Sequence, residues 1–479
     1  LRKIPCALLI NRIYFTLRTI EMECSMEIQR KAYNRLVEWK KEANGRSALL
    51  IEGARRIGKS TLAEHFGKRE YKSYILVDFN KASKKIRENF NTNLNNLDVF
   101  FQVLSLEYNK PLYKRETLII FDEIQKFPKA RESIKYLVAD GRYDFIETGS
   151  LISIKENVND ITIPSEEEKL KMFPCDFEEF AKALGEDVLL EYIGKCFAQK
   201  KPLEDHFHKR ATRLFREYMR VGGMPQSIVA YAENNRDFLK SDKEKRKILN
   251  LYRDDIRKAS KHYNSKVSAI FENIPGYLST HEKKIVLTEI DKSNAATFSK
   301  YDEPLFWLDD SMICNLCYKC DDPNIGFALN KNESFVKCYL GDTGLLVSLA
   351  FSENEIASNQ LYKSIMDGKL SLNEGMLHEN MIAQMIRAKG RKLFFYTEYD
   401  AAKHRNSMEI DFLLSNESKV NFKIQPVEVK SSKNYTTTSL GKFKNKFKKR
   451  VGESIIVHPK QLTIEDGIIK VPSYMAWCI

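Results

Sequence analysis

The sequence predicts an α/β protein whose first large domain, residues 26–164, is built on a parallel β-sheet. Four short apolar segments alternate with helical segments there: SALLIEG (47–53), SYILVDF (73–79), TLIIFDE (117–123) and YDFIETGS (143–150). Their nearly continuous apolar character is typical of strands that helices cover on both faces. A glycine-containing loop follows the first strand, and polar residues end the third and fourth. Ligands of open α/β sheets bind at the carboxyl ends of strands, so the same pattern predicts where a site lies.

Length and composition predict several domains and a polyanionic partner. The chain has 479 residues, 43% apolar and 30% charged, whereas one domain usually holds about 100 to 200 residues. The formal net charge of +13 favours nucleic acid as a partner. Nine cysteines at irregular spacing predict reduced thiols and a cytoplasmic protein. No apolar run reaches the roughly 20 residues of a membrane span, so we expect no membrane partner.

The remaining segments follow from their periodicity. Residues 1–25 are expected to lie upstream of the natural start, because Met26 opens an amphipathic helix. Apolar residues at three- and four-residue spacing predict a helical subdomain at 165–262, and residues 263–350 mix helices with short strands. An α/β pattern resumes at 351–479, with helices at 375–390 and 439–450 and strands at 392–398, 408–415, 424–432, 453–459 and 474–479.

The first strand is followed by GARRIGKS at residues 53–60, which matches the phosphate-loop pattern GxxxxGK[ST], the Walker A motif. The two glycines allow positive φ, so that backbone N–H groups surround an anion, and the following helix directs its positive dipole end to the same point. Lys59 is expected to contact the β- and γ-phosphates of ATP, and the Ser60 hydroxyl to bind Mg²⁺. The residues predicted to surround ATP are Gly53, Ala54, Arg55, Arg56, Ile57, Gly58, Lys59, Ser60 and Thr61.

A chance match in a glycine-containing turn is the alternative, and a second motif argues against it. The third strand ends in Asp122 and Glu123, a Walker B pattern, in which Asp122 holds Mg²⁺ through its water shell and Glu123 orients the attacking water. The next strand brings Thr148 and Ser150 to the same edge, where they are expected to sense the γ-phosphate. The predicted catalytic residues are Glu123, Lys59 and Asp122. For each carboxylate or hydroxyl alone, an ordinary strand-end residue remains the alternative.

From about residue 26 to its end, the chain resembles prokaryotic AAA-type ATPases that carry a C-terminal domain similar to restriction endonucleases. The motifs that carry the resemblance are GARRIGKSTL, LIIFDEIQKFP, ETGS, FPCDFEEF, VGGMP, YRDDI and GDTGLL. It implies a P-loop ATPase core at 26–164, a helical lid at 165–262, a winged-helix-like module at 263–350 and a nuclease-like domain at 351–479. ARRI inside the loop departs from the more usual PRQV. An arginine that such ATPases supply in trans is not evident, and Arg220 and Arg253 are the candidates.

The C-terminal segment also resembles PD-(D/E)xK nucleases. Asp411 in EIDF lies 17 positions before Glu428 in VEVK, and Lys430 follows two residues later, so Glu428 and Lys430 share one face of a strand. In such nucleases the two acidic residues bind a divalent metal and the lysine positions the attacking water. Glu379 matches their helix carboxylate. The alternative is a nuclease-like fold without catalysis.

The motifs predict a cytoplasmic AAA-type ATPase that hydrolyses ATP with Mg²⁺ and couples hydrolysis to the binding or processing of DNA or RNA. The alternative is a nucleotide-dependent switch or scaffold that binds a protein partner and whose nuclease-like domain is inactive. A homo-oligomer is left open.

Overall fold

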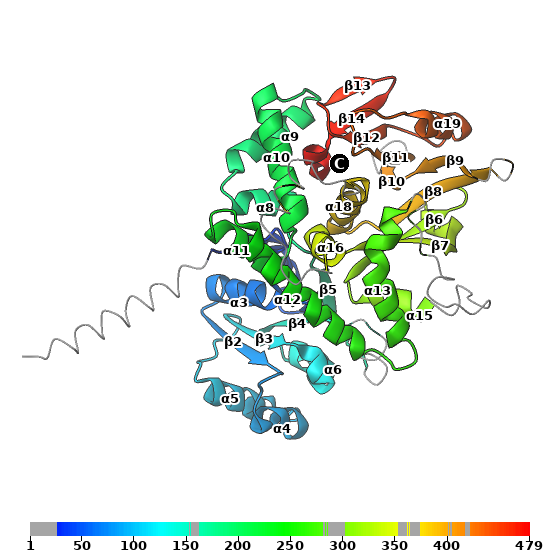
Figure 1. Cartoon of the computed structure of the whole chain (residues 1–479). Coiled ribbons are helices and arrows are strands. Elements are labelled where there is room, and N and C mark those ends of the chain that lie inside the picture. The colour runs from blue at the N-terminus through cyan, green and yellow to red at the C-terminus, as the bar shows by residue number, and fades with distance from the viewer. Residues whose placement is uncertain are drawn as a thin grey trace, which may run out of the picture.

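The protein is described by a computed structural model that covers residues 26–152, 154, 162–280, 283, 285, 302–352, 362, 364, 374–400, 402, 405–416 and 422–479. The expectation for residues 1–25 lies outside this part of the chain. Figure 1 shows the first sheet and its helices in the lower half and the C-terminal sheets at the upper right, and helix α12 (Phe238–Arg257) crosses the middle.

The first sheet is parallel, as predicted, and has the strand order β2-β3-β4-β1-β5. Its strands are β1 (Ala48–Glu52), β2 (Ser73–Asp78), β3 (Thr117–Asp122), β4 (Asp144–Gly149) and β5 (Glu167–Lys171). The four apolar segments form the first four strands. The edge strand β5 was not predicted, because its sequence EEKLK is charged and largely exposed and lacks the apolar pattern of a buried strand.

Helices cover both faces of this sheet. They are α2 (Ala32–Ala43), α3 (Lys59–Glu70), α4 (Lys84–Thr92), α5 (Leu97–Tyr108) and α6 (Pro128–Asp140), and a short 3₁₀ turn η1 (Ile124–Lys126) follows β3. Successive strand residues point to opposite faces: Leu49 and Ile51 pack in the core with α2 and α3, whereas Ala48 and Leu50 pack with α4, α5 and α6. Both faces are therefore apolar, which explains the continuous apolar runs.

A helical segment follows the sheet and links it to the rest of the protein. Its helices are α8 (Phe177–Ala183), α9 (Asp187–Ala198), α10 (Asp205–Val221), α11 (Pro225–Glu233) and α12 (Phe238–Arg257). The apolar faces of these helices belong to the same core as α3 and the later helices α16 (Thr343–Ala350) and α18 (Glu374–Ala388). The helical segment thus joins the two ends of the molecule through one continuous core.

The segment expected as a separate winged-helix-like module shares a sheet with the C-terminal segment. It contains α13 (Asn264–Ser279), α15 (Asp302–Asp310), β6 (Cys314–Cys320), η3 (Phe327–Asn330), β7 (Lys331–Leu340) and α16 (Thr343–Ala350). Strand β6 pairs antiparallel with β7 and parallel with β8 (Leu393–Asp400), which in turn pairs with β9 (Arg405–Ile410). The order of this sheet is β7-β6-β8-β9. Residue 350 therefore does not separate two independent sheets, because β6 before it pairs with β8 after it.

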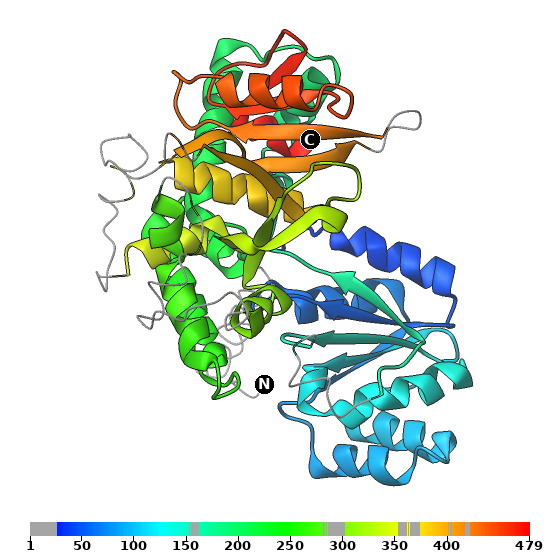
Figure 2. The same ribbon diagram turned by 90° about the vertical axis from the view of Figure 1, so that its right-hand side faces the viewer.

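The C-terminal segment builds a mixed sheet of order β10-β11-β12-β14-β13. Its elements are α18 (Glu374–Ala388), β8 (Leu393–Asp400), β9 (Arg405–Ile410), β10 (Phe412–Asn416), β11 (Lys423–Val429), α19 (Thr438–Lys446), β12 (Ser454–His458), β13 (Thr463–Glu465) and β14 (Ile468–Pro472). Figure 2 shows these strands above the first sheet, with α18 between.

One predicted strand is wrong. YMAWCI at 474–479 forms the 3₁₀ helix η4 (Ser473–Cys478), which packs on α9, α10 and α18. A short apolar run without alternation does not distinguish a strand from a buried helical turn, and here the sheet ends at β14.

Candidate nucleotide site

The predicted phosphate loop connects β1 to α3 and has the backbone that an anion cup requires. Gly53 and Gly58 have φ of 157° and 91°, and Arg56 also lies in the left-handed region at 69°. A Cβ on Gly53 would lie 2.3 Å from the carbonyl oxygen of Met172, so only glycine fits there. The helix α3 begins at Lys59, and its free N–H groups point toward the loop.

Lys59 lies against the loop that precedes it. Its Nζ donates hydrogen bonds to the carbonyl oxygens of Gly53 at 3.0 Å and Ala54 at 2.8 Å, and the residue is 6% exposed. Burial lowers the pKa of Lys59 to about 8, although Glu123 and Asp122 favour its charged form. The ammonium group is thus held at the loop, where phosphate oxygens would replace the carbonyl oxygens.

Three oxygen-bearing side chains meet beside the loop. Ser60 donates its hydroxyl hydrogen to Asp122 Oδ1 at 2.6 Å, and Thr148 donates to the same oxygen. They come from α3, β3 and β4, and the strand order explains the meeting: β4 lies between β1 and β3, so all three carboxyl ends form one edge. Hydroxyl and carboxylate oxygens are the ligands that Mg²⁺ prefers, so Ser60 and Asp122 fit this ion.

Glu123 lies next to this cluster in a left-handed conformation, with φ of 54°. Its carboxylate accepts a hydrogen bond from Gln125 Nε2 at 2.6 Å. Gln125 in turn packs on Gly149, since a Cβ there would lie 2.4 Å from its Oε1. The end of β4 thus fixes Gln125, which is the hydrogen-bond partner of Glu123. The spacing of residues in the sequence does not reveal the contact between Gln125 and Gly149. Ser150 is buried directly after β4, and Thr61 is exposed in the first turn of α3.

The loop also contacts the helix α12, about 200 residues further along the chain. Arg55 pairs with Asp255 at 2.9 Å, and the Tyr252 hydroxyl donates to the Arg55 carbonyl oxygen at 3.2 Å. Pro225 at the start of α11 approaches the loop as well, since a Cβ on Gly58 would lie 3.7 Å from its Cγ. The helical segment therefore packs on the phosphate loop itself.

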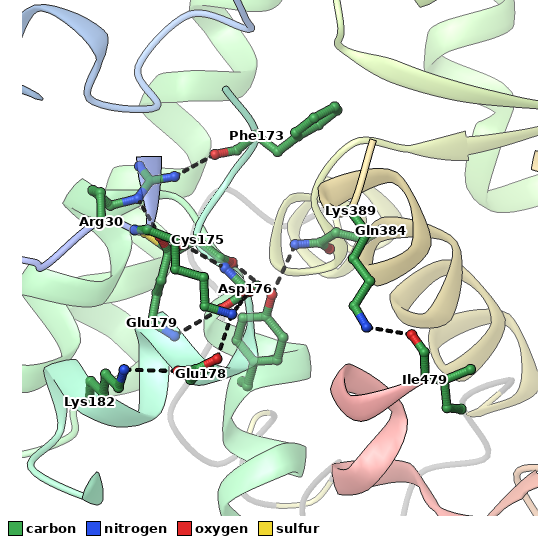
Figure 3. A network of polar contacts seen from close by, with 12 residues as sticks. Arg30, Phe173, Cys175, Asp176, Glu178, Glu179, Lys182, Gln384, Lys389 and Ile479 are labelled. Atoms are coloured by element: carbon green, nitrogen blue, oxygen red, sulfur yellow. Dashed lines mark hydrogen bonds and ion pairs between the residues drawn. The ribbon is translucent and has the colours of Figure 1, made fainter. Parts of the chain in front are cut away.

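Arg30 is a residue of this site that we did not predict (Figure 3). Its guanidinium donates to the carbonyl oxygens of Ile57 and Phe173, both at 2.6 Å, and to Glu179 Oε1 at 3.2 Å. The side chain of Arg30 is 8% exposed and that of Glu179 is 6% exposed. Arg30 thus ties the phosphate loop to the segment before α8. One basic residue in the N-terminal stretch of a basic chain gives no signal of such a role.

The same network continues from this segment to the C-terminal helix α18 (Figure 3). The N–H of Cys175 donates to the Gly223 carbonyl oxygen at 2.7 Å, and the Cys175 carbonyl oxygen accepts from the Tyr218 hydroxyl at 2.7 Å. Gln384 on α18 donates to that hydroxyl at 3.2 Å. Asp342 joins the network: it accepts from the N–H of Gly223 and, at 2.8 Å, from the N–H of Leu345. A continuous chain of buried polar contacts links loop and C-terminal segment.

The two arginines considered for action in trans are both engaged within the chain. Arg220 is 1% exposed and donates to the Arg216 carbonyl oxygen at 2.8 Å. Arg253 forms a two-pronged pair with Glu272, at 2.7 and 3.0 Å. Burial excludes Arg220 from reaching another subunit in this conformation, and Arg253 would have to leave Glu272.

The carboxylates of the predicted nuclease-like site lie near one another, but lysines neutralise the first of them. Glu379 on α18 pairs with Lys283 and, at 3.3 Å, with Lys337, and it accepts a hydrogen bond from Tyr339. Burial opposes ionisation of Glu379, but Lys337 and Lys283 outweigh it and lower its pKa to about 2. The two lysines were not predicted as part of this site, because they lie 96 and 42 positions before Glu379 in the chain.

Asp411 lies between β9 and β10, and Glu428 lies near the end of the adjacent strand β11. Asp411 accepts from the N–H of Val429 at 2.8 Å, and burial, aided by the charge on Glu379, raises its pKa to about 7. Lys430 pairs with Glu428 at 2.9 Å, so these two residues share a face as predicted. In the described part of the chain, no three His, Cys, Asp or Glu side chains are grouped so that they could hold one metal ion.

Two further expectations concern thiols and membranes. Every cysteine that the structure describes is a free thiol. No helix among the described residues is both long and apolar enough to cross a membrane.

Three family models match the sequence in succession. Residues 45–181 match the AAA domain, residues 212–355 match a domain of unknown function (DUF8612), and residues 374–475 match another (DUF4143). The first match contains the phosphate loop, both residues of the acidic motif, and Thr148. This part of the chain is therefore similar to an AAA domain of the P-loop type. The other two descriptions assign no activity.

Comparison with solved structures gives distant likenesses. A Walker-type ATPase of Pyrococcus abyssi is 15% identical, with 67% of this chain and 96% of that chain covered and a TM-score of 0.38. The Aeropyrum pernix ORC1 protein in complex with DNA is 14% identical, with 69% and 94% covered and a TM-score of 0.28. The Thermotoga maritima RuvB Holliday junction branch migration motor is 14% identical, with 60% and 89% covered and a TM-score of 0.29. All three TM-scores lie below 0.5, so the assignment rests on the family model and the site. A search among curated proteins gave no match.

Proposed function

We propose that the protein binds and hydrolyses ATP with Mg²⁺. The observation that carries this proposal is the meeting of Ser60, Asp122 and Thr148 beside a loop with the backbone of an anion cup. Ser60 and Asp122 would hold Mg²⁺, which neutralises charge on the phosphates when bound. Lys59 would hold the β- and γ-phosphates in place of the loop carbonyl oxygens. Glu123, oriented by Gln125, would accept the proton of the attacking water.

We further propose that hydrolysis is coupled to nucleic acid through the C-terminal segment. The net charge of +13 favours a polyanion. Contacts from the loop through Arg30 and Tyr218 to Gln384 on α18 provide a route along which nucleotide binding would act on the C-terminal segment.

Two variants test the ATP site. Lys59→Ala should abolish nucleotide binding, and Glu123→Gln should bind ATP but stop turnover. Lys68→Ala is a matched control, because Lys68 lies on the same helix with its side chain 55% exposed. Binding of a fluorescent ATP analogue and phosphate release are measured for each variant. Normal phosphate release by Glu123→Gln would contradict its role.

A second candidate is a nucleotide-dependent switch or scaffold with an inactive nuclease-like domain. It is favoured by the two lysines that pair with Glu379, because they compete with a metal ion for this carboxylate. Stimulation of ATP hydrolysis by DNA or RNA supports the coupling to nucleic acid. A rate of hydrolysis that no polynucleotide changes supports the switch or scaffold. Plasmid cleavage with Mg²⁺ or Mn²⁺ that is lost in Asp411→Ala would show an active nuclease and contradict the inactive domain.

A further inference from the structure

A basic cavity lies between the helical segment and the C-terminal segment. It has a volume of about 1060 Å³ and is lined by α10, by the turn between α11 and α12, and by two C-terminal loops that contain Lys433 and Pro459. These loops follow the parallel strands β11 and β12. The cavity is therefore placed at the carboxyl ends of two parallel strands, where ligands of α/β sheets bind.

The lining carries more cations than carboxylates. Five lysine or arginine side chains and two carboxylates face the cavity. Both carboxylates have partners. Glu217 pairs with Arg213 at 3.3 Å and with Arg236 at 3.2 Å. Asp237 caps α12 by accepting a hydrogen bond from the N–H of Leu239 at 2.8 Å. A positive excess remains after these pairs are counted.

Three cations supply this excess. Among the residues that the structure describes, none of Lys209, Arg216 and Lys433 takes part in an ion pair. Lys209, Arg213 and Arg216 recur at spacings of four and three residues along α10, so they form one stripe that extends over about 10 Å of the helix. Lys433 faces this stripe from the C-terminal segment.

We propose that this cavity binds the phosphate backbone of a nucleic-acid strand. The inference rests on the proposed coupling to nucleic acid and assigns its place. Regularly spaced cations suit charges that repeat along a backbone, as phosphates do. An acidic protein segment is less suited, because the side chains that anchor protein interfaces include exposed tryptophan and tyrosine besides arginine. None of the exposed large apolar side chains in the described part of the chain lines this cavity.

The location has a consequence for the C-terminal site. Lys430 lies directly after β11, three residues before Lys433, and pairs with Glu428. A strand that contacts Lys433 would pass close to these residues. It would also contact both α10, which packs on α12 and α16, and the C-terminal loops. Strand binding would therefore bridge the helical segment and the C-terminal sheet.

The test compares two double charge reversals. Lys209→Glu/Lys433→Glu alters the cavity, and Lys84→Glu/Lys135→Glu makes the same charge change at exposed positions of α4 and α6. The probe is a fluorescent oligothymidylate of about 20 nucleotides, longer than the roughly 4 to 16 that a single-strand site takes. Anisotropy is recorded at several salt concentrations, together with ATP hydrolysis without DNA, which both double variants should retain.

We expect the cavity variant to bind at least about tenfold more weakly and its salt slope to fall by about 1.4, since each lost phosphate contact removes about 0.7 on single strands. The control variant should bind like the wild type. Equal binding by both variants, or equal loss in both, would overturn the assigned place while leaving nucleic-acid coupling intact. A wild-type protein that binds no oligonucleotide but does bind polyglutamate through the cavity would overturn the inference and the coupling together.

Discussion

Replacement of Arg30 by methionine tests whether the phosphate loop depends on a residue outside the AAA motifs. Arg30→Met keeps most of the apolar stem of the side chain but removes the guanidinium group and with it the hydrogen bonds to Ile57, Phe173 and Glu179. Glu179 then stays buried without a cationic partner. The change is thus expected to affect both folding and nucleotide binding.

The structure sets the size of the effect. Removing one partner of a buried ion pair costs about 3 to 5 kcal/mol. Glu179 keeps the N–H groups of Lys31 at 2.7 Å and Asp176 at 3.0 Å as donors, so we expect the lower end, about 3 kcal/mol of unfolding free energy. A hydrogen bond from a charged group contributes about 1.5 to 3 kcal/mol, so release of the Ile57 carbonyl oxygen should weaken nucleotide binding by about tenfold or more.

The assay combines denaturant unfolding with titration of a fluorescent ATP analogue. Arg35→Met is the matched control, because Arg35 lies five residues further along on α2, has a side chain that is 66% exposed and pairs with the exposed Glu38. Its effect should stay within about 0.5 kcal/mol. A double-mutant cycle with Glu179→Gln isolates the ion pair. If Arg30→Met unfolds like the wild type and binds nucleotide with the same affinity, Arg30 does not support the phosphate loop.

Three further changes have expected outcomes. Gly344→Ala should destabilise the fold by about 1 to 3 kcal/mol, because its Cβ would lie 2.5 Å from the N–H nitrogen of Gly222. Gly441→Ala on α19 should stabilise the fold instead, because nothing lies within 4 Å of its Cβ. A denaturant unfolding experiment in which Gly344→Ala is the more stable variant would contradict both expectations. Lys337→Met should cost about 3 to 5 kcal/mol in the same assay, since it leaves two paired carboxylates without this fully buried cation; a neutral result would show that the pairs do not matter. Burial lowers the pKa of His458 to about 4, whereas the pKa in the unfolded chain is about 6.5. The unfolded chain therefore binds this proton at higher pH, and the free energy of unfolding falls as the pH drops from about 6.5 to 4. His458→Gln should flatten this decline, and parallel stability curves for the variant and the wild type would contradict the prediction.

The sequence by itself determined the elements whose signals are local. The phosphate loop is defined by eight adjacent residues, and the first four strands by apolar runs that need no knowledge of their neighbours. The order of these runs was enough to predict that Ser60 and Asp122 face one another, because parallel strands end at one edge. Failures arose where the local pattern was weak, as in the charged strand β5 and in the apolar turn η4.

Tertiary structure alone decided the contacts between residues far apart in the chain. Arg30 reaches the loop across 27 positions and Glu179 across 149, and Lys337 reaches Glu379 across 42. Single surface-like lysines and arginines carry no periodicity that marks them as buried, so the sequence predicted three acidic residues and one lysine near the C-terminal strands but not the two lysines that neutralise Glu379. The shared sheet of β6 and β8 was hidden for the same reason: parallel pairing joins strands across a long connection, and only packing of the whole chain selects the partner.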